Sequence, residues 1–275
     1  MTLPSRKKPP TTAPDTMAKK SLVDFGREWL DTLVVALSVA MAFRAYFYQP
    51  FNIPTGSMQP TLYGNHVQAC EKPGILQKTP LKWLNWLLTG RDYKEVRAPF
   101  SGHLYVSPRG DGRFALAIVA PDGRRGPVVN LPNDALGQLP VSPGGRVQKG
   151  QRLFAGYDTT GDFIFVNRWL WNFRRPHTGE VMIFSTTGIA ALQQGTHYIK
   201  RMKAAPGETY TLEHPVNGQA PVSVTMGPDE YFACGDNFNN SFDSRYWGAV
   251  PGRNLRGVAS CVFWPIVNPR LGGIK

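Results

Sequence analysis

An uncharged apolar segment near the N-terminus constrains the fold of this 275-residue chain more than any other feature. Residues 32–43 read TLVVALSVAMAF, and an aromatic run that ends at Tyr48 follows shortly after. Counted from Trp29 to Tyr48, the segment has about 20 residues, which is the length of a helix that crosses the hydrocarbon core of a bilayer. Residues 29–49 are therefore predicted to form a transmembrane anchor.

The distribution of basic residues predicts the orientation of this anchor. Six basic residues precede it: Arg6, Lys7, Lys8, Lys19, Lys20 and Arg27. Because Lys and Arg accumulate on the cytoplasmic side of a membrane segment, residues 1–28 are predicted to be a basic cytoplasmic tail. The rest of the chain would then follow a single pass and lie on the periplasmic, or extracytoplasmic, side of the cell (inner) membrane. Two alternatives are a cleaved signal peptide, which needs small residues where this chain has aromatic ones, and a buried helix of a soluble protein.

The overall composition narrows the fold class and the partners. With 28 glycines and 24 prolines, the chain favours short strands joined by many turns over a helical bundle. The net charge of +12 suits an anionic membrane surface, and no zinc-finger or helix-turn-helix pattern indicates nucleic-acid binding. The three cysteines form no Cys-x-x-Cys pair, so neither a disulfide framework nor a zinc site is predicted. Cys234 and Cys261 are predicted to be small buried residues of strands, and the state of Cys70 stays open.

Three segments outside the anchor carry candidate chemistry. Residues 51–62 read FNIPTGSMQPTL, in which a Gly-Ser step between two prolines forms a rigid turn that presents the hydroxyl of Ser57. Nucleophilic catalysis needs such a hydroxyl with backbone N–H groups nearby, although most Gly-Ser turns are only turns. Residues 197–208, HYIKRMKAAPGE, are a strand-like run into a Pro-Gly turn, and residues 235–248 read GDNFNNSFDSRYWG.

Together with residues 179–184, GEVMIF, these segments resemble the four motifs of bacterial signal peptidase I (leader peptidase), a family of serine/lysine peptidases classed as S26. The resemblance covers residues 29–64 and roughly 157–266. It puts Ser57 at the nucleophile and Lys200 at the general base, and it implies an antiparallel β catalytic domain. Phe238 and Asn239 stand where charged residues are common in the family, and Thr55 stands where many members have Ser or Gly.

The resemblance also implies roles for residues around the two catalytic ones. The Ser57 backbone N–H and the Thr55 hydroxyl would hold the oxyanion, and Ser241 would hydrogen-bond the Lys200 amine. Asp243 and Arg245 would form a supporting ion pair, for which a purely loop-stabilising role is the alternative.

A lysine base must be neutral, although the free amine has a pKa of about 10.4. Burial disfavours the ammonium, and lowering the pKa to about 8 costs roughly 3 kcal/mol. Strand alternation leaves Lys200 and Lys203 as alternatives, and the resemblance selects Lys200. The five histidines form no convincing Ser/His/Asp set, and His197 is the one that merits a mutation.

Substrate recognition follows from the strand geometry. An extended peptide can add as a strand beside the sheet, with alternate side chains in pockets. The family prefers small residues one and three positions before the cut, which implies shallow pockets. Candidate walls, each equally compatible with an ordinary core position, are Phe51, Ile53, Pro54, Met58, Leu62, Tyr198 and Ile199.

In ordinary members of the family a short strand directly follows the serine segment. Here residues 161–168, GDFIFVNR, resemble that strand, and a long insertion separates them from the serine segment. The predicted catalytic β domain therefore comprises residues 50–64 and 157–275, and residues 65–156 form a β-rich inserted subdomain. Its apolar residues 83–88 are either a membrane-surface segment or a small core helix. Residues 97–102 and 143–153 resemble the paired hairpins of lipoyl-like barrels, but without the lysine attachment motif, so no cofactor is predicted.

The sequence thus predicts a mainly β protein with one N-terminal transmembrane helix. The predicted function is a membrane-bound serine endopeptidase that cleaves N-terminal signal peptides from exported preproteins after small residues, with a Ser/Lys dyad and no metal or cofactor. Its predicted partners are preprotein signal peptides and membrane lipid, with the secretion machinery as a further candidate. The alternatives are a specialised maturation peptidase of the same clan and a membrane-anchored adaptor.

Overall fold

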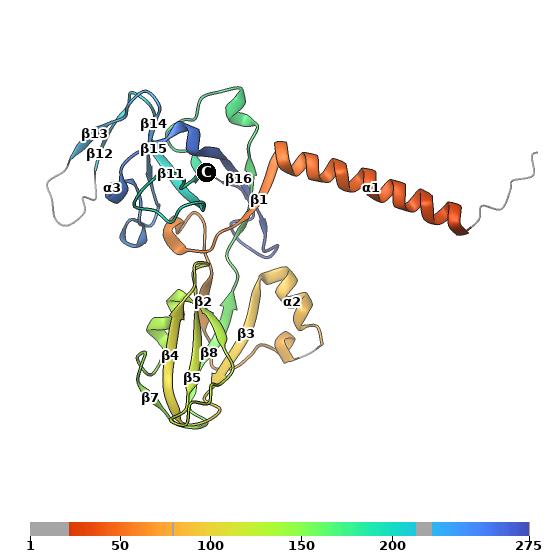
Figure 1. Cartoon of the computed structure of the whole chain (residues 1–275), viewed down its shortest axis with the longest axis vertical. Helices are drawn as coiled ribbons and strands as arrows, with labels where there is room; N and C mark the ends of the chain where they lie inside the picture. Colours follow the sequence, from red (N-terminus) through yellow and green to blue (C-terminus); the bar gives the residue numbers. More distant parts are fainter. Residues whose placement is uncertain (1–21, 79, 213–221, 275) are drawn as a thin grey trace, which may run out of the picture. The chain divides into compact units, whose positions relative to one another are not determined.

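The computed structural model describes residues 22–78, 80–212 and 222–274, and it divides after Phe43 into two compact units (Figure 1). The helices are α1 (Leu22–Tyr46), α2 (Lys82–Thr89) and α3 (Ser244–Trp247). The strands are β1 (Tyr48–Asn52), β2 (His66–Ala69), β3 (Arg91–Arg97), β4 (Gly102–Pro108), β5 (Arg113–Val119), β6 (Val129–Pro132), β7 (Arg146–Val147), β8 (Arg152–Thr159), β9 (Phe163–Asn167), β10 (Val181–Ser185), β11 (His197–Ala204), β12 (Thr209–Thr211), β13 (Ser223–Thr225), β14 (Glu230–Cys234), β15 (Val250–Pro251), β16 (Leu255–Trp264) and β17 (Gly272–Gly273). The prediction of a mainly β fold is confirmed.

Helix α1 is long and apolar enough to cross a membrane over Val23–Tyr46. None of this span is buried. The few hydroxyls are satisfied within the helix, since Thr32 donates to the Glu28 carbonyl and Ser38 to the Val34 carbonyl. Internal hydrogen bonds, together with the uncharged and largely apolar residues 32–43, suit a bilayer. The basic residues predicted to set its orientation lie outside the described residues, except Arg27.

One antiparallel sheet carries the second unit, in the order β1-β9-β16-β10-β11-β14-β15, with β17 beside β16. Its central strand β10, VMIFS, is buried at all five positions, which is typical of a strand covered on both faces. Buried residues of the sheet and the serine segment form one core cluster: Ile53, Met58, Leu62, Ile164, Val166, Val181, Ile183, Ala259 and Val262. The serine segment is therefore part of this core.

Two strand edges of this sheet remain available for a further strand. β1 pairs with β9, and it is the first strand in the order. β11 pairs with β14 only from Arg201 onward, so within the described residues 197–200 pair with β10 alone. Residues of both edges line one small cavity, which brings the end of β1 close to the start of β11. The sheet is therefore curled enough to bring these two edges together.

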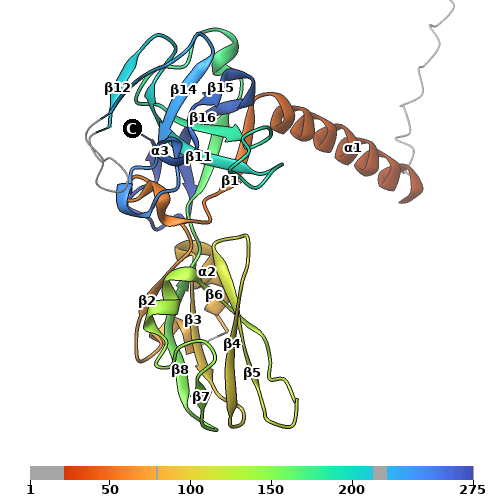
Figure 2. The same cartoon turned by 60° about the vertical axis from the view of Figure 1, so that its left-hand side comes forward.

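Residues between the serine segment and β9 form two further sheets, β2-β8-β3 and β6-β5-β4-β7 (Figure 2). They share a separate core of twelve buried residues: Val67, Val96, Ala98, Leu104, Phe114, Leu116, Ile118, Leu131, Ala135, Val147, Leu153 and Phe154. The two segments predicted to pair are hydrogen-bonded to each other, from Ala98 N to Gln151 O at 2.9 Å and from Gly150 N to Ala98 O at 2.8 Å. The last strand, β8, runs to Thr159, beyond the predicted boundary at residue 156. A lipoyl-like architecture stays a prediction.

Helix α2 holds the apolar segment for which two interpretations were open. Trp83 and Trp86 are 62% and 45% exposed, and no residue of the helix is buried. The interpretation as a small core helix is therefore wrong. The helix contacts the sheet at its far end, where Trp264 Nε1 donates to the Leu87 carbonyl at 2.6 Å.

Candidate active site

Ser57 lies in a short 3-10 turn, Gly56–Met58, that follows β1. The turn is fixed by its neighbours on both sides. Met58 and Leu62 are completely buried in the core, and the Leu62 backbone N–H donates to the Met58 carbonyl at 2.9 Å. The Ser57 carbonyl accepts a hydrogen bond from the Asn237 backbone N–H at 3.0 Å. The buried Met58 side chain, directly after Ser57, thus fixes the turn and with it the position of the Ser57 hydroxyl.

Lys200 lies in β11 opposite Met182 of β10. Lys200 and Met202 are both buried, while Lys203 lies on the other face with its ammonium 5.5 Å from the centre of the Phe238 ring. The Lys200 amine donates to Ser57 Oγ over 2.7 Å. Ser57 is 7% exposed and Lys200 is 4% exposed, so bulk water is largely excluded from this contact.

The surroundings of Lys200 change its proton affinity. Burial lowers the pKa of Lys200 from its ordinary value of 10.5 to about 8, and the negative charge of Asp243 opposes this shift in part. Desolvation acts in this direction because the charged ammonium loses its hydration shell. A pKa of about 8 leaves a substantial neutral fraction near neutral pH, and a neutral amine can accept a proton from the Ser57 hydroxyl.

The third motif segment, residues 235–248, contributes an ion pair close to the dyad. Asp243 and Arg245 form a pair with Oδ1 and Nε 2.8 Å apart, and both side chains are nearly inaccessible to water. Asp243 Oδ2 also accepts from the Gly235 backbone N–H at 3.0 Å. Gly235 lies so close that an added Cβ would be 2.4 Å from the Ser57 carbonyl oxygen and 2.3 Å from Ser241 Oγ. The pair therefore holds the backbone that packs directly against Ser57.

The expected hydrogen bond from Ser241 to the Lys200 amine is not formed. Ser241 Oγ is buried and has no hydrogen-bond partner among the described residues. The Lys200 amine is instead directed at Ser57 Oγ.

Arg201, Asp236 and Thr61 form a second polar network near the dyad, to which the sequence analysis assigned no role. Arg201 binds Asp236 in a bidentate manner, with Nε and Nη2 each 2.8 Å from a carboxylate oxygen. Thr61 donates to the same carboxylate at 2.6 Å. Burial alone would raise the pKa of Asp236, but the hydrogen bonds from Arg201 and Thr61 outweigh it and lower the pKa. The network ties the serine segment to β11. Arg201 and Asp236 carry opposite charges and lie within two of the motif segments, and these charges were the signal available in the sequence.

A cleft of about 330 Å³ opens onto Ser57 and Lys200. Its walls are the serine segment, the start of β11 and three separate loops: Pro54, Thr55, Gly56, Ser57, Gly110, Gln193, Thr196, His197, Tyr198, Ile199, Lys200, Asn240 and Phe242. Thr55 is exposed here, and its side chain makes no capping bond to the turn.

The predicted substrate-contacting residues fall into two groups. Pro54, Tyr198 and Ile199 line the cleft, and with Phe51 and Ile53 they also line an adjoining cavity of about 30 Å³. Met58 and Leu62 do not line either space, because both are 0% exposed in the core. Their prediction as pocket walls is wrong, since an apolar residue beside a turn fits a core position as well as a pocket.

The cysteines and His197 lie outside the hydrogen bonds of the dyad. All three cysteines are free, so Cys70 forms no disulfide, and burial raises the pKa of Cys234 to about 12. Cys234 is buried as predicted, and Cys261 is only partly buried. His197 is at the cleft with its ring 5.6 Å from that of Phe51, and burial lowers its pKa.

Comparison with known proteins relates the chain to one family. The family model described as "Signal peptidase, peptidase S26" matches residues 26–78 and 213–264. "Probable signal peptidase I-2" of Synechocystis sp. is 34% identical over 128 residues, which is 40% of this chain and 58% of that protein. "Signal peptidase I" of Leptolyngbya laminosa is 32% identical over 124 residues, 38% of this chain and 61% of that protein. The chain thus spans about six tenths of the length of these two relatives.

Two further matches cover other shares of the sequence. "Signal peptidase I" of Pseudomonas aeruginosa is 27% identical over 268 residues, which cover 92% of this chain and 76% of that protein. A crystal structure of a signal peptidase I from Enterococcus faecalis has a TM-score of 0.25 and 20% identity, and covers 31% of this chain and 97% of that chain.

Proposed function

Because this chain is related to the S26 signal peptidases, we propose that it is a membrane-bound serine endopeptidase that cleaves signal peptides from exported preproteins. One observation carries the proposal. A lysine amine lies 2.7 Å from a serine hydroxyl in a site that nearly excludes water, at the end of an open cleft. A buried lysine whose pKa is lowered to about 8 is equipped for the role of general base.

The proposed reaction begins with the neutral Lys200 amine, which accepts the Ser57 proton as Oγ attacks the scissile carbonyl. The carbonyl π electrons move to the oxygen, and we assign the Ser57 N–H and the exposed Thr55 hydroxyl to that oxyanion. One such donor is typically worth about 10²–10³ in rate. The oxyanion collapses, the C–N bond breaks, and the Lys200 ammonium returns the proton to the leaving amine. Lys200 then accepts a proton from a water molecule as the water oxygen attacks the acyl carbon of the ester. The bond from this carbon to Ser57 Oγ breaks, the Lys200 ammonium returns the proton to Oγ, and the carboxylic acid product leaves.

The cleft suits an extended peptide. The edges of β1 and β11 near Pro54 and Tyr198 are open within the described residues, so a peptide can add its backbone between them. The adjoining cavity is small, about 30 Å³, compared with about 330 Å³ for the cleft, so we assign it to a small side chain of the substrate. This supports cleavage after small residues.

We propose α1 as a single-pass anchor with its N-terminus in the cytoplasm and the rest of the chain outside. The exposed Trp83 and Trp86 of α2 support a second contact with lipid, because tryptophan favours the membrane–water interface. Lys82 at the start of the helix forms a salt bridge with Asp92 at 2.7 Å, so the proposed contact depends on the two tryptophans. Contact with the secretion machinery is a further proposal.

The test uses the full chain in detergent, incubated with several preproteins. We expect cleavage by the parent protein and none by Ser57→Ala or Lys200→Arg, since an arginine stays charged at any accessible pH. Lys203→Arg is the matched control and should cleave normally. Cleavage of one preprotein alone would indicate a specialised maturation peptidase. Unchanged cleavage by Ser57→Ala would reject the proposed dyad, and absence of cleavage in every case would favour an adaptor.

A further inference from the structure

The insertion reaches the serine segment through the tip of the β4–β5 hairpin, residues 109–112. At this tip Gly112 has a φ of +73°, and a Cβ there would lie 2.3 Å from the Pro54 carbonyl oxygen. A contact this close tolerates no side chain, and the left-handed backbone also favours glycine. The hairpin backbone therefore packs directly against the serine segment, three residues before Ser57.

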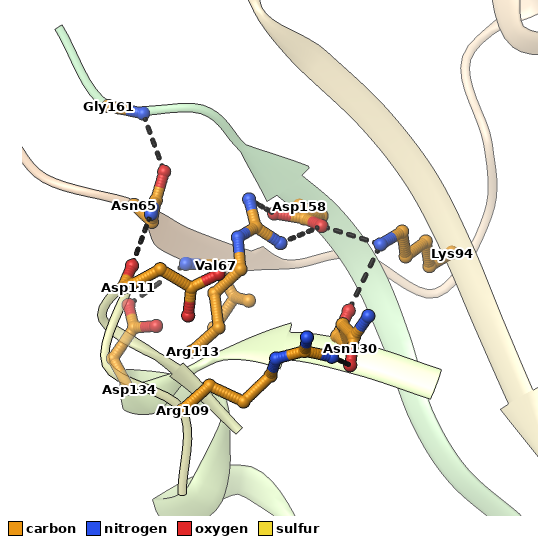
Figure 3. A network of polar contacts seen from close by, with 10 residues as sticks. All are labelled: Asn65, Val67, Lys94, Arg109, Asp111, Arg113, Asn130, Asp134, Asp158 and Gly161. Atoms are coloured by element: carbon orange, nitrogen blue, oxygen red, sulfur yellow. Dashed lines mark hydrogen bonds and ion pairs between the residues drawn. The ribbon is translucent and has the colours of Figure 1, made fainter. Parts of the chain in front are cut away.

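Hydrogen bonds to both connections of the insertion hold this tip in place. Asn65, which leads out of the catalytic domain, donates to the Asp111 carbonyl at 3.1 Å and accepts from the Gly161 N–H, on the return connection, at 3.1 Å (Figure 3). The Gly112 carbonyl accepts from the Asn133 N–H at 3.1 Å. The tip is thus attached to its own subdomain and to the catalytic domain.

Two cations around a buried carboxylate fix the start of β5, directly after the tip. Arg113, the first residue of β5, binds the Asp158 carboxylate with contacts of 2.7 and 3.1 Å, and Lys94 binds it at 2.7 Å (Figure 3). Asp158 lies in β8, the last strand of the insertion, and is buried. Two cations around one buried carboxylate leave little freedom for the hairpin relative to β8.

Gly110, at the end of this braced tip, lines the catalytic cleft beside Pro54, Thr55 and Ser57. It is exposed, and a Cβ at this position would meet nothing within 4 Å. A Cβ added at Gly110 would therefore have open space around it, at a position that lines the cleft. The absence of a side chain keeps that space free for a substrate.

We propose that the hairpin tip of the insertion is a wall of the substrate cleft, and that Gly110 sets how large a peptide can pass next to the scissile bond. This inference rests on the proposed peptidase function. The tip makes the insertion a specificity-determining part of the enzyme and not only a spacer, because it narrows a cleft that the catalytic domain alone leaves wider.

The test is a size series at Gly110, with Gly110→Ala, Gly110→Leu and Gly110→Trp in the full chain in detergent. Steady-state cleavage of a preprotein is measured together with the thermal midpoint. We expect KM to rise with side-chain size and to reach about tenfold or more for Gly110→Trp, while kcat changes far less, as for a residue that limits substrate entry. The matched control is Gly137→Trp, because Gly137 lies in the insertion away from the cleft and also has nothing within 4 Å of an added Cβ.

Three results would overturn the inference. The first is a KM for Gly110→Trp equal to that of the parent. The second is a loss confined to kcat, which would mean that the tip acts through Ser57. The third is a rise of KM in Gly137→Trp equal to that in Gly110→Trp. If Gly110→Trp fails to fold, the Ala and Leu variants decide by the same criterion. A parent chain without Ser57-dependent cleavage would reject the proposed function itself, whereas Ser57-dependent cleavage with parental KM across the series rejects only the role of the tip.

Discussion

Replacing Lys200 by methionine should make the protein more stable while it abolishes catalysis. Methionine matches the length of most of the lysine side chain but carries no charge, and the site already contains Met182 and Met202. A catalytic base that is kept away from water is a source of instability, since its charged form is destabilised in the folded state. Lys200→Met removes that source.

The magnitude follows from the proton affinity of Lys200. The difference between its ordinary pKa of 10.5 and about 8 in the folded protein corresponds to about 3 kcal/mol of destabilisation of the charged form. Loss of the hydrogen bond to Ser57 offsets about 1 kcal/mol of the gain. We therefore expect Lys200→Met to stabilise the fold by about 2 kcal/mol near pH 7, or about 4–8 °C in thermal midpoint.

The gain in folding stability from Lys200→Met should also depend on pH in a defined direction. Because the folded pKa of Lys200 is lower than the unfolded one, the unfolded chain binds a proton that the folded chain lacks between about pH 8 and pH 10.5. The stability of the parent protein therefore rises across this range, and the advantage of Lys200→Met is complete below about pH 8 and disappears toward pH 10.5.

The assay is thermal unfolding of the full chain in detergent, followed by near-ultraviolet circular dichroism at a series of pH values. Lys203→Met is the matched control, since Lys203 lies on the opposite face of β11, and its stability difference from the parent should not follow the same pH dependence. A destabilised Lys200→Met, or a gain that stays constant up to pH 10.5, would refute the reasoning about the buried amine.

Three further predictions concern other parts of the structure. Asp243→Ala should destabilise the protein by about 3–5 kcal/mol in thermal unfolding, because it removes the carboxylate that the nearly inaccessible Arg245 guanidinium binds, and a loss below about 1 kcal/mol would contradict this. Met58→Ala should cost about 2–5 kcal/mol, as for a core residue, and a negligible loss of stability would instead indicate a pocket wall. In lipid vesicles, brominated lipids should quench tryptophan fluorescence less in the double variant Trp83→Phe, Trp86→Phe than in the parent, and equal quenching would exclude a lipid contact of α2.

The sequence predicted those features that depend on local patterns. Alternation along β11 placed Lys200 with Met202 and Lys203 on the other face, and the resemblance to the family, not the alternation, selected the face of Lys200, which is buried. The apolar run of α1 and the abundance of turn residues predicted one helix and a mainly β fold. These properties follow from neighbours within a few positions along the chain.

Features that depend on tertiary contacts were missed or wrong. The pairing of Arg201 with Asp236 and Thr61 joins three separate segments, and no periodicity specifies it. Met58 was predicted as a pocket wall because apolar residues suit pockets and cores equally. The contact of Gly112 with Pro54 depends on how the insertion folds back, which its sequence pattern does not encode.

The pH dependence of preprotein cleavage tests the central claim most directly. If Lys200 is the general base, kcat/KM should rise with pH as a single ionisation with a midpoint of about 8 and then reach a plateau, since only the neutral amine accepts the Ser57 proton. His197→Gln should leave this midpoint unchanged. A rate that does not change between about pH 6 and pH 9, or a midpoint below about 6.5 that disappears in His197→Gln, would contradict a neutral lysine as the base.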